Sequence, residues 1–487
     1  MFRAIIWAII LLFACGFHLG SALAYDGSCQ KKFDKQWTDS EKWVWMNLCQ
    51  GKEADLDDRK HTGDLSNSNS AALDYNVISA DFLERIVTDQ KYQGLLPNQG
   101  LQIIHGKIHG TLNLENAELK TRIRIRSSEF DGDVLMSGMI SSYGIDFENS
   151  KVAGKFDGNS MTVRRLELVG FGLKNMMDLT GAKISGYFVM KCANIQRDIW
   201  ADFMSVDGFV LLDHALLGTR LMLRYGKFGA DVRLHRSQLT LVDFSGSTVQ
   251  GEILFDDNNQ HSATCPESPR TLWNPSKISN EPQLILRNTT AASWRGRRDG
   301  WPQMDLDGFT YSRFQVDELG PVEDIGSWAK RWLAKNTTTS FQPYQQNADA
   351  MSKVGFSANA NDVLFAGKER ERVESSGLKY VEMSVARWLI GYGYGYRYFF
   401  ALGWAALLVV IGLFVICASG ENDGKADDDK LGVLYCIDML LPLIQFRKKN
   451  FETEARLPLV RRYFYVHKLL GYILGAFILA GLSGITK

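Results

Sequence analysis

The sequence lacks the features on which a redox, zinc-dependent or nucleic-acid-binding function usually rests. Its 487 residues include seven cysteines, too few for a disulfide scaffold in a chain of this length, and no Cys-x-x-Cys pair. A thioredoxin-like site and a zinc site built on paired cysteines are therefore unsupported. Basic and acidic residues number 55 each, so the formal net charge is zero. Because there is no basic excess to attract nucleic acid, we expect no nucleic-acid partner, and we expect no metal and no cofactor.

The first 24 residues have the three parts of a secretory signal peptide. Met1-Phe2-Arg3 is followed by an apolar run over 4–17 and by Ala22-Leu23-Ala24. We expect export with cleavage after Ala24, the alternative being an uncut signal anchor. In the exported chain Cys29 and Cys49 lie close in sequence, and an oxidising compartment favours their pairing. They form the one disulfide that we predict.

A figure of about eleven residues recurs along the middle of the chain. Two apolar residues one apart are followed by a small residue and a further apolar residue, as in Val232, Leu234, Ser237 and Leu239. The alternation makes a short strand with one inward face, and so short a unit buries that face only by stacking on its neighbours. Two figures would form one coil of about 22 residues in a parallel β-helix. A helical interpretation fails because pairs at i, i+2 dominate.

The sequence therefore predicts a mainly β protein, a parallel β-helix or solenoid over residues 104–315. Prolines break the period at 258–282, where we expect an inserted loop. Residues 25–103 are expected to form a helical N-terminal cap over the open strand edges. Residues 325–376 are expected to form a C-terminal helical hairpin.

Residues 385–487 have the pattern of a membrane anchor with transmembrane helices. Phe399–Ala418 and Tyr463–Ile485 are long enough to span a bilayer, and aromatic residues crowd the start of each. The apolar piece between them, Leu431–Phe446, is short. A full crossing by this piece would place the basic segment 447–462 outside, so we expect it to be re-entrant or interfacial.

Asp438 lies inside that short apolar piece, where a carboxylate is costly. Either it faces water at the membrane interface, which we favour, or it is buried beside a cation. Lys468 and His467, near the start of the second span, are the nearest candidates for such a partner.

The order of these parts is similar to that of a known group of proteins. The stretches that carry the resemblance are "WTDSEKWVWMNLCQGKEADL", "ISADFLERIV", "LTGAKISGYFVMK", "DLDGFTYSRF", "QPYQQNADAMSKVGFSANANDVLFAGKERER" and "YGYGYRYFFALGW". The chain resembles a family of bacterial membrane-anchored β-solenoid proteins with degenerate pentapeptide-like repeats. Some relatives are labelled membrane-associated oxidoreductase, but the sequence has no GxGxxG after a strand, no redox dithiol and no haem-attachment motif. The resemblance implies no catalytic residues.

The residue between the two inward positions of each figure points outward, so successive coils stack these residues into rows. One row places Asp157 beside Asp178, and another places Asp146 beside Glu167. Two adjacent carboxylates can share a proton or bind Ca²⁺, as polysaccharide-cleaving β-helices do. We favour the plainer interpretation, a solvated acidic face.

The same rows continue with large apolar side chains in the middle coils. Trp200 falls beside Met222, and Val189 beside Leu211. Exposed contiguous apolar surface usually marks a binding site. The sequence supports equally a contact patch for a partner and a patch covered by the 258–282 loop.

A basic and aromatic stretch, "WRGRRDGW", is a second candidate binding site. Its tryptophans and arginines can stack on sugars or pair with anionic groups of an envelope polymer; they are Trp294, Arg295, Arg297, Arg298 and Trp301. We favour a solvated loop whose tryptophans tuck against the solenoid.

Taken together, these features predict a protein of the bacterial inner membrane with its solenoid in the periplasm. The expected function is binding or scaffolding of an envelope protein or polymer. The alternatives are a polysaccharide-acting enzyme that uses the acidic rows and a transport or signalling component that uses Asp438.

Overall fold

The computed structural model describes residues 29, 32–58, 76–255, 265, 283–316, 324–426, 430–441, 446–448, 450 and 454–482. The signal peptide predicted for residues 1–24 lies outside these ranges, as does the predicted 258–282 insertion apart from Cys265. The chain divides into two compact units, Met1–Glu318 and Leu319–Lys487, which are described separately below.

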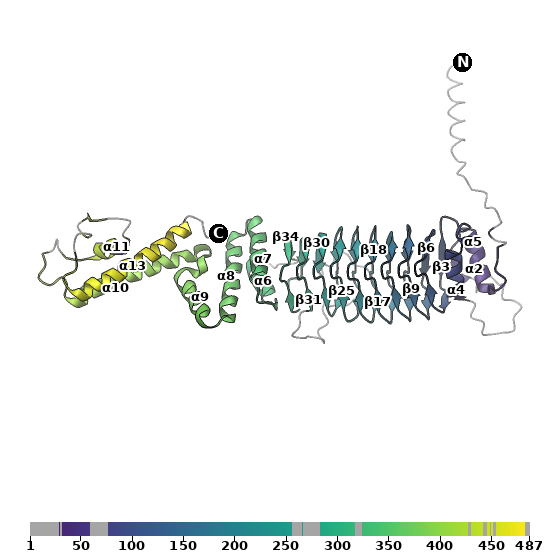
Figure 1. Ribbon diagram of the computed structural model, residues 1–487, viewed down its shortest axis with the longest axis horizontal. Helices are drawn as coiled ribbons and strands as arrows, with labels where there is room; N and C mark the ends of the chain where they lie inside the picture. Colours follow the sequence, from purple (N-terminus) through teal and green to yellow (C-terminus); the bar gives the residue numbers. More distant parts are fainter. Residues whose placement is uncertain are drawn as a thin grey trace, which may run out of the picture. The chain divides into compact units, whose positions relative to one another are not determined.

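The first unit is a parallel β-solenoid of about nine turns, which confirms the predicted parallel β-helix (Figure 1). Each full turn contains two eleven-residue figures, because Ile199 pairs with Leu221 and Val210 with Val232. The first strand of each full turn belongs to a nine-stranded sheet, which we call sheet C. Its members are β5 (Leu112–Asn113), β9 (Val134–Leu135), β13 (Phe156–Asp157), β17 (Met177–Asp178), β21 (Ile199–Trp200), β25 (Leu221–Met222), β29 (Val242–Asp243), β31 (Leu284–Ile285) and β33 (Met304–Asp305).

Sheet A follows sheet C within each turn and consists of two ladders of strands. The first ladder contains β6 (Glu118–Leu119), β10 (Ile140–Ser141), β14 (Thr162–Val163), β18 (Lys183–Ile184), β22 (Ser205–Val206) and β26 (Lys227–Phe228). The second contains β1 (Ala54–Asp55), β3 (Leu101–Ile104), β7 (Ile123–Arg126), β11 (Gly144–Asp146), β15 (Arg165–Glu167), β19 (Phe188–Val189), β23 (Val210–Leu211) and β27 (Val232–Arg233). In the last turns one long strand covers both ladders, namely β30 (Thr248–Phe255), β32 (Thr290–Gly296) and β34 (Thr310–Val316).

Sheet B closes the turn between sheet A and the next strand of sheet C. Its eight strands are β2 (Val77–Ser79), β4 (Lys107–His109), β8 (Glu129–Phe130), β12 (Lys151–Val152), β16 (Gly172–Leu173), β20 (Asn194–Ile195), β24 (Leu216–Leu217) and β28 (Gln238–Leu239). Strand β29 pairs directly with β31, so the solenoid resumes after the insertion, as predicted. Strands β1 and β2 also join the stack, which therefore begins well before residue 104.

Two corners of each turn use a left-handed backbone conformation. The corner between sheets A and B has positive φ at His105, Ser127, Asn149, Gly170, Cys192, His214 and Arg236. The corner between sheets C and A, the C–A corner, has positive φ at Asn116, Gly138, Ser160, Gly181, Phe203, Tyr225, Gly246, Asn288 and Gly308. Glycine and asparagine adopt this conformation most readily, which explains their recurrence in the eleven-residue figure.

In several turns the residue directly after the corner is a buried serine, and its hydroxyl holds neighbouring turns together. Ser247 accepts a hydrogen bond from the Gly226 N–H (2.8 Å) and donates one to the Leu223 carbonyl (2.6 Å). Ser150 and Ser237 bridge neighbouring turns in the same way. The small residue therefore satisfies buried backbone groups as well as making room for the turn.

In the described part of the chain before β3, the helices are α2 (Asp39–Cys49), α4 (Ala80–Thr88) and α5 (Gln90–Gln93). They lie at the end of the strand stack that contains β3 and β6 (Figure 1). Thr38 and Glu41 form the capping box that begins α2. Cys29 and Cys49 form a disulfide with their Cα atoms 5.8 Å apart, so the chain before α2 is tied to the end of that helix.

The second unit is helical. Among its described residues the helices are α6 (Ile325–Leu333), α7 (Gln342–Lys353), α8 (Ser357–Glu374), α9 (Gly377–Ile390), the 3₁₀ turns η3 (Gly391–Gly393) and η4 (Gly395–Phe399), α10 (Phe400–Ser419), α11 (Val433–Leu440) and α13 (Pro458–Leu482). Among the described residues, one continuous helical stretch, Gly395–Ser419, is long and apolar enough to cross a membrane, and little of it is buried. It contains the first predicted span, and α13 overlaps the second.

Candidate functional site

The outward rows have the register that the sequence predicts. Asp157 pairs with Asp178 on sheet C, and Asp146 with Glu167 on sheet A. Asp178 is followed along its row by Trp200 and Met222, and Glu167 by Val189 and Leu211.

The acidic residues of these rows use their oxygen atoms to shape the turn. Asp157, Asp178 and Asp146 each accept a hydrogen bond from the backbone N–H two residues later, at 3.2, 2.8 and 3.0 Å. Such Asx turns lead the chain into the following corner. Further along sheet C, Asp243 and Asp305 do the same. The recurring aspartate is therefore part of the fold.

Three of the four carboxylates predicted in these rows also form ion pairs. Lys155 lies 3.1 Å from Asp157, Arg124 lies 3.4 Å from Asp146, and Arg165 lies 2.9 Å from Glu167. Burial raises the pKa of Asp146, and the nearby Glu167 and Glu148 add to the effect. In the part of the chain that the structure describes, no three ligating side chains gather as a metal site would require.

The apolar part of the rows is less exposed than predicted. Met222 is buried, so its place in a contact patch is wrong. Val189, Leu211 and Trp200 are half-buried. The Arg220 guanidinium lies over the Trp200 ring at 5.1 Å and also pairs with Asp198, so one ring face is partly covered.

The neighbouring C–A corner exposes two aromatic side chains that the sequence patterns did not single out. Phe203 is 63% exposed and Tyr225 is 55% exposed, and their rings stack with centroids 5.1 Å apart. Both residues have a left-handed backbone, with φ of 58° and 56°. Trp200 belongs to the strand that leads into Phe203, and we call Trp200, Phe203 and Tyr225 the aromatic corner. The other turns have glycine, asparagine or serine at this position. Two aromatic residues in a row of such residues are the feature by which the aromatic corner could have been found from the predicted register.

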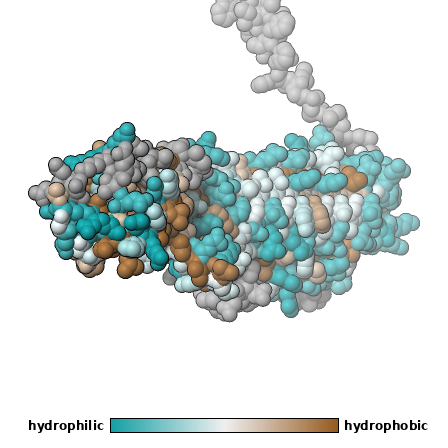
Figure 2. Space-filling view, turned by 60° about the vertical axis from the view of Figure 1, so that its left-hand side comes forward, coloured by the Kyte–Doolittle hydropathy of each residue, from teal (hydrophilic) through white to brown (hydrophobic). Residues whose placement is uncertain are grey.

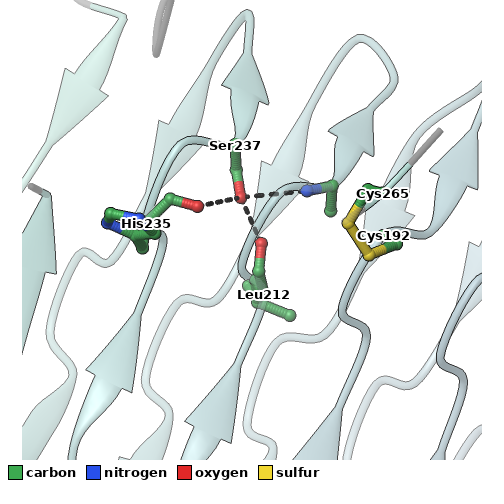
Figure 3. Close-up of a disulfide and its surroundings, with 6 residues drawn as sticks. Cys192, Leu212, His235, Ser237 and Cys265 are labelled. Carbon is green, nitrogen blue, oxygen red and sulfur yellow. Dashed lines mark hydrogen bonds between the residues drawn. A yellow bond between two sulfur atoms is a disulfide. The ribbon is translucent and has the colours of Figure 1, made fainter. Parts of the chain in front are cut away.

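A second disulfide, which the sequence did not predict, anchors the insertion. Cys192 and Cys265 are bonded with Cα atoms 5.7 Å apart (Figure 3). Cys192 occupies the left-handed position of the A–B corner, three residues after Val189. Figure 3 also shows the Ser237 hydroxyl, which donates to the Leu212 carbonyl and accepts from the Ala215 N–H, both in the preceding turn. Cys265 is therefore tied covalently to the A–B corner of the solenoid.

The basic and aromatic stretch is not a sugar-binding loop. Trp294 and Arg295 belong to β32, and Trp294 is buried with its ring stacked on Phe314. Trp301 is also buried, and its indole N–H donates to the Arg297 carbonyl at 3.0 Å. Because neither indole face is open, the predicted stacking on sugars is wrong, although the predicted tuck against the solenoid is confirmed. Arg295 lies 3.4 Å from Glu252, and Arg298 lies 3.7 Å from Asp299.

Sheet B carries a shallow hollow of about 730 Å³. Its wall includes an outward row in which Lys107, Glu129 and Lys151 alternate in charge, followed by Gly172. His109 and Asp131 pair on its rim at 2.6 Å. The hollow has paired charges and runs along the stack.

Asp438 is fully buried, so the expectation that it faces water is wrong. Its carboxylate accepts hydrogen bonds from the Phe446 N–H (2.7 Å), the Arg447 N–H (3.2 Å) and the Asn450 side chain (2.7 Å). The proposed His467 partner instead contacts the Cys436 carbonyl, at 3.1 Å. Among the residues that the structure describes, backbone and amide donors stabilise this carboxylate.

Comparisons of the chain with protein-family models, with curated proteins and with solved structures gave no match, so its function has to be argued from these surfaces.

Proposed function

We propose that this protein binds or scaffolds a component of the bacterial cell envelope, with the aromatic corner as its contact surface. The component is a protein or a polymer. In this proposal the solenoid lies in the periplasm, and the helical unit attaches it to the inner membrane. The helices before β3 act as the N-terminal cap, and α7 with α8 as the helical hairpin.

The observation that carries this proposal is that the aromatic corner lowers the stability of the folded solenoid. A bulky residue held in the left-handed region costs about 1–3 kcal/mol, and two occur side by side. Stacking returns only about 0.5–1.5 kcal/mol for the pair. The exposed ring surface gives no burial energy to offset the rest. Since Gly181 and Gly246 fill the same position in adjacent turns without strain, the aromatic residues are better explained by binding than by folding.

Membrane attachment is supported by composition on both sides of the solenoid. A predicted signal peptide precedes it, and the Gly395–Ser419 helix follows it. The basic segment 447–462 favours the cytoplasmic side for the loop between the two predicted spans.

The two alternative functions have weaker support. The enzyme hypothesis needs free carboxylates, but Asp157, Asp178 and Asp146 each accept a backbone hydrogen bond, and Asp157 and Asp146 also pair with lysine or arginine. The transport or signalling hypothesis needs Asp438 to exchange partners, but three local donors hold it.

Site-specific photocrosslinking tests the proposal. A benzophenone side chain at position 203 or 225 of the full-length protein should give a crosslinked product in cells. The matched control is position 160, which has the same left-handed backbone in the same corner two turns away. No product at 203 or 225, or equal products at all three positions, would count against the aromatic corner as the contact surface.

A further inference from the structure

The helix α9 exposes its apolar face and packs its charged face against α8. A helix of a water-soluble unit is expected to do the opposite. Leu378, Val381, Val385 and Trp388 follow one another at spacings of three and four residues, which places them on one side of the helix. They are 89%, 55%, 50% and 64% exposed. An apolar stripe of this length facing outward marks a contact surface.

The opposite side of α9 packs on α8 through charges. Lys379 lies 2.9 Å from Glu371, and Arg387 lies 3.0 Å from Glu369. Met383 is buried on the same side. Hydrogen bonds from Lys368 and Lys379 hold the pKa of Glu371 below its usual range, so these pairs are ionised at neutral pH. The charged face of α9 therefore packs within the helical unit, and the apolar face is exposed for an external contact.

The apolar stripe is continuous with the exposed surface of α10. The Trp404 indole N–H donates to the Trp388 carbonyl at 2.8 Å, which joins the end of α9 to the first turns of α10. A hollow of about 360 Å³ with apolar walls lies between the two helices and is lined by Val381, Val385, Trp388 and Trp404 among others. Brown hydrophobic residues gather on the helical unit in Figure 2.

Aromatic residues gather where α9 meets α10. Tyr396, Phe399 and Phe400 are exposed at the start of the Gly395–Ser419 helix, and Trp388 lies at the end of α9. Aromatic residues concentrate at the boundary between the headgroups and the hydrocarbon of a bilayer. This position places α9 at the level of that boundary if α10 spans the membrane.

The turn between α9 and α10 holds the two helices in a fixed relation. Gly391 has a left-handed φ of 55°, and a Cβ there would lie 2.5 Å from the Arg397 Cβ. Tyr392 is also left-handed and donates a hydrogen bond to Glu369 (2.6 Å). Arg397 pairs with Asp362 of α8 at 2.7 Å. These contacts make the turn a rigid joint between α9 and the helix that follows.

We infer that α9 is an in-plane membrane helix whose Leu378, Val381, Val385 and Trp388 enter the headgroup and upper acyl-chain region of the bilayer. This inference rests on the proposed membrane attachment. Amphipathic helices bind at this depth when one face is apolar and the other carries basic residues. The rigid joint then fixes α8 and its neighbours at a set height and angle above the lipid surface.

Depth-dependent fluorescence quenching tests this inference on the full-length protein in phospholipid vesicles. Cys417 and Cys436 are the free cysteines among the described residues, and replacing both with alanine leaves the two disulfides intact. Single cysteines are then introduced by Val381→Cys or Val385→Cys and labelled with an environment-sensitive fluorophore. Glu382→Cys is the matched control on the same helix, Val410→Cys reports on α10, and Lys151→Cys reports on the solenoid.

The expected result is a blue-shifted emission at 381 and 385, with loss of iodide quenching and strong quenching by a nitroxide near the lipid headgroup. Position 410 should be quenched most by a nitroxide near the acyl-chain end, and position 151 only by iodide. The inference is overturned if iodide quenches position 381 as strongly as position 151 while position 410 is still quenched most by the nitroxide near the acyl-chain end. That result would leave the proposed membrane attachment intact. Iodide quenching at 410 defeats the attachment itself. Protection at 381 from every quencher, with disulfide crosslinks between copies, overturns it in favour of self-association.

Discussion

The buried serine after a corner gives the sharpest test of how the solenoid is held together. Ser247 is 1% exposed and bridges two turns through the Gly226 N–H and the Leu223 carbonyl. Ser247→Ala removes both bonds in a place that water does not reach. An unsatisfied buried N–H costs about 1–3 kcal/mol, so we expect a loss of about 2 kcal/mol. For a folding unit of roughly 200 residues this lowers the melting temperature by about 4–8 °C.

The assay is thermal unfolding of the detergent-purified full-length protein, followed by circular dichroism. Ser185→Ala is the matched control, because Ser185 is exposed in the same solenoid. The control should stay within about 0.5 kcal/mol of the wild type. If Ser247→Ala melts with the wild type, or if both variants lose the same stability, the hydroxyl bridges do not hold the turns together and the reasoning is refuted.

Four further predictions concern the disulfide, the acidic rows and Asp438. Cys265→Ser should lower the free energy of unfolding by about 2–4 kcal/mol, because the disulfide closes a long loop; unchanged denaturant unfolding would contradict this. Asp157→Asn with Asp178→Asn should leave cellular function intact, because asparagine also accepts the turn hydrogen bond; a stable double variant without function would favour the enzyme hypothesis. Burial raises the folded-state pKa of Asp146 above its ordinary 3.8, so its contribution to stability is present below that pH and is lost as pH rises through the raised value. Asp146→Asn should therefore gain stability relative to the wild type between acid and neutral pH, and parallel pH profiles would count against this. Asp438→Ala leaves three donors unpaired and should expose the 446–450 segment to protease more than Asp438→Asn does; equal cleavage of the two would be evidence that the hydrogen bonds are dispensable.

The strand register was predictable because it follows from periodicity alone. The alternation of apolar residues fixes which face of a strand is inward. Because successive turns stack in register, each residue then pairs with the equivalent residue of the next turn. That is why Asp157 lies beside Asp178 and Trp200 beside Met222. The register does not predict how exposed an outward side chain is, however. Met222 occupies an outward position of its strand but is buried.

Contacts between residues far apart in sequence were not predictable in this way. Cys192 and Cys265 are 73 residues apart, and nothing in the eleven-residue figure says that the insertion returns to an earlier corner. Trp294 is expected in a loop, but it lies in the strand β32. In β32 a single strand covers both ladders of sheet A, so the spacing of inward residues is no longer that of two short strands.

The roles of polar groups depended on neighbours that the sequence pattern does not identify. The sequence placed Asp438 in an apolar segment, but its partners are backbone N–H groups eight and nine residues later. The row aspartates suggested paired carboxylates, yet each uses an oxygen for the turn that follows it. Local backbone geometry decided the role of the side chain in both cases.

The most direct test of the aromatic corner replaces both strained residues with the residue that the solenoid uses elsewhere in that corner. Phe203→Asn with Tyr225→Asn relieves two left-handed aromatic residues, as Asn116 and Asn288 do in their own turns. We predict that the melting temperature stays the same or rises while the crosslinked product at a neighbouring position, Trp200, is lost. A double variant that keeps its crosslinked product, or that melts well below the wild type, would show that the aromatic pair serves the fold and would contradict the proposed function.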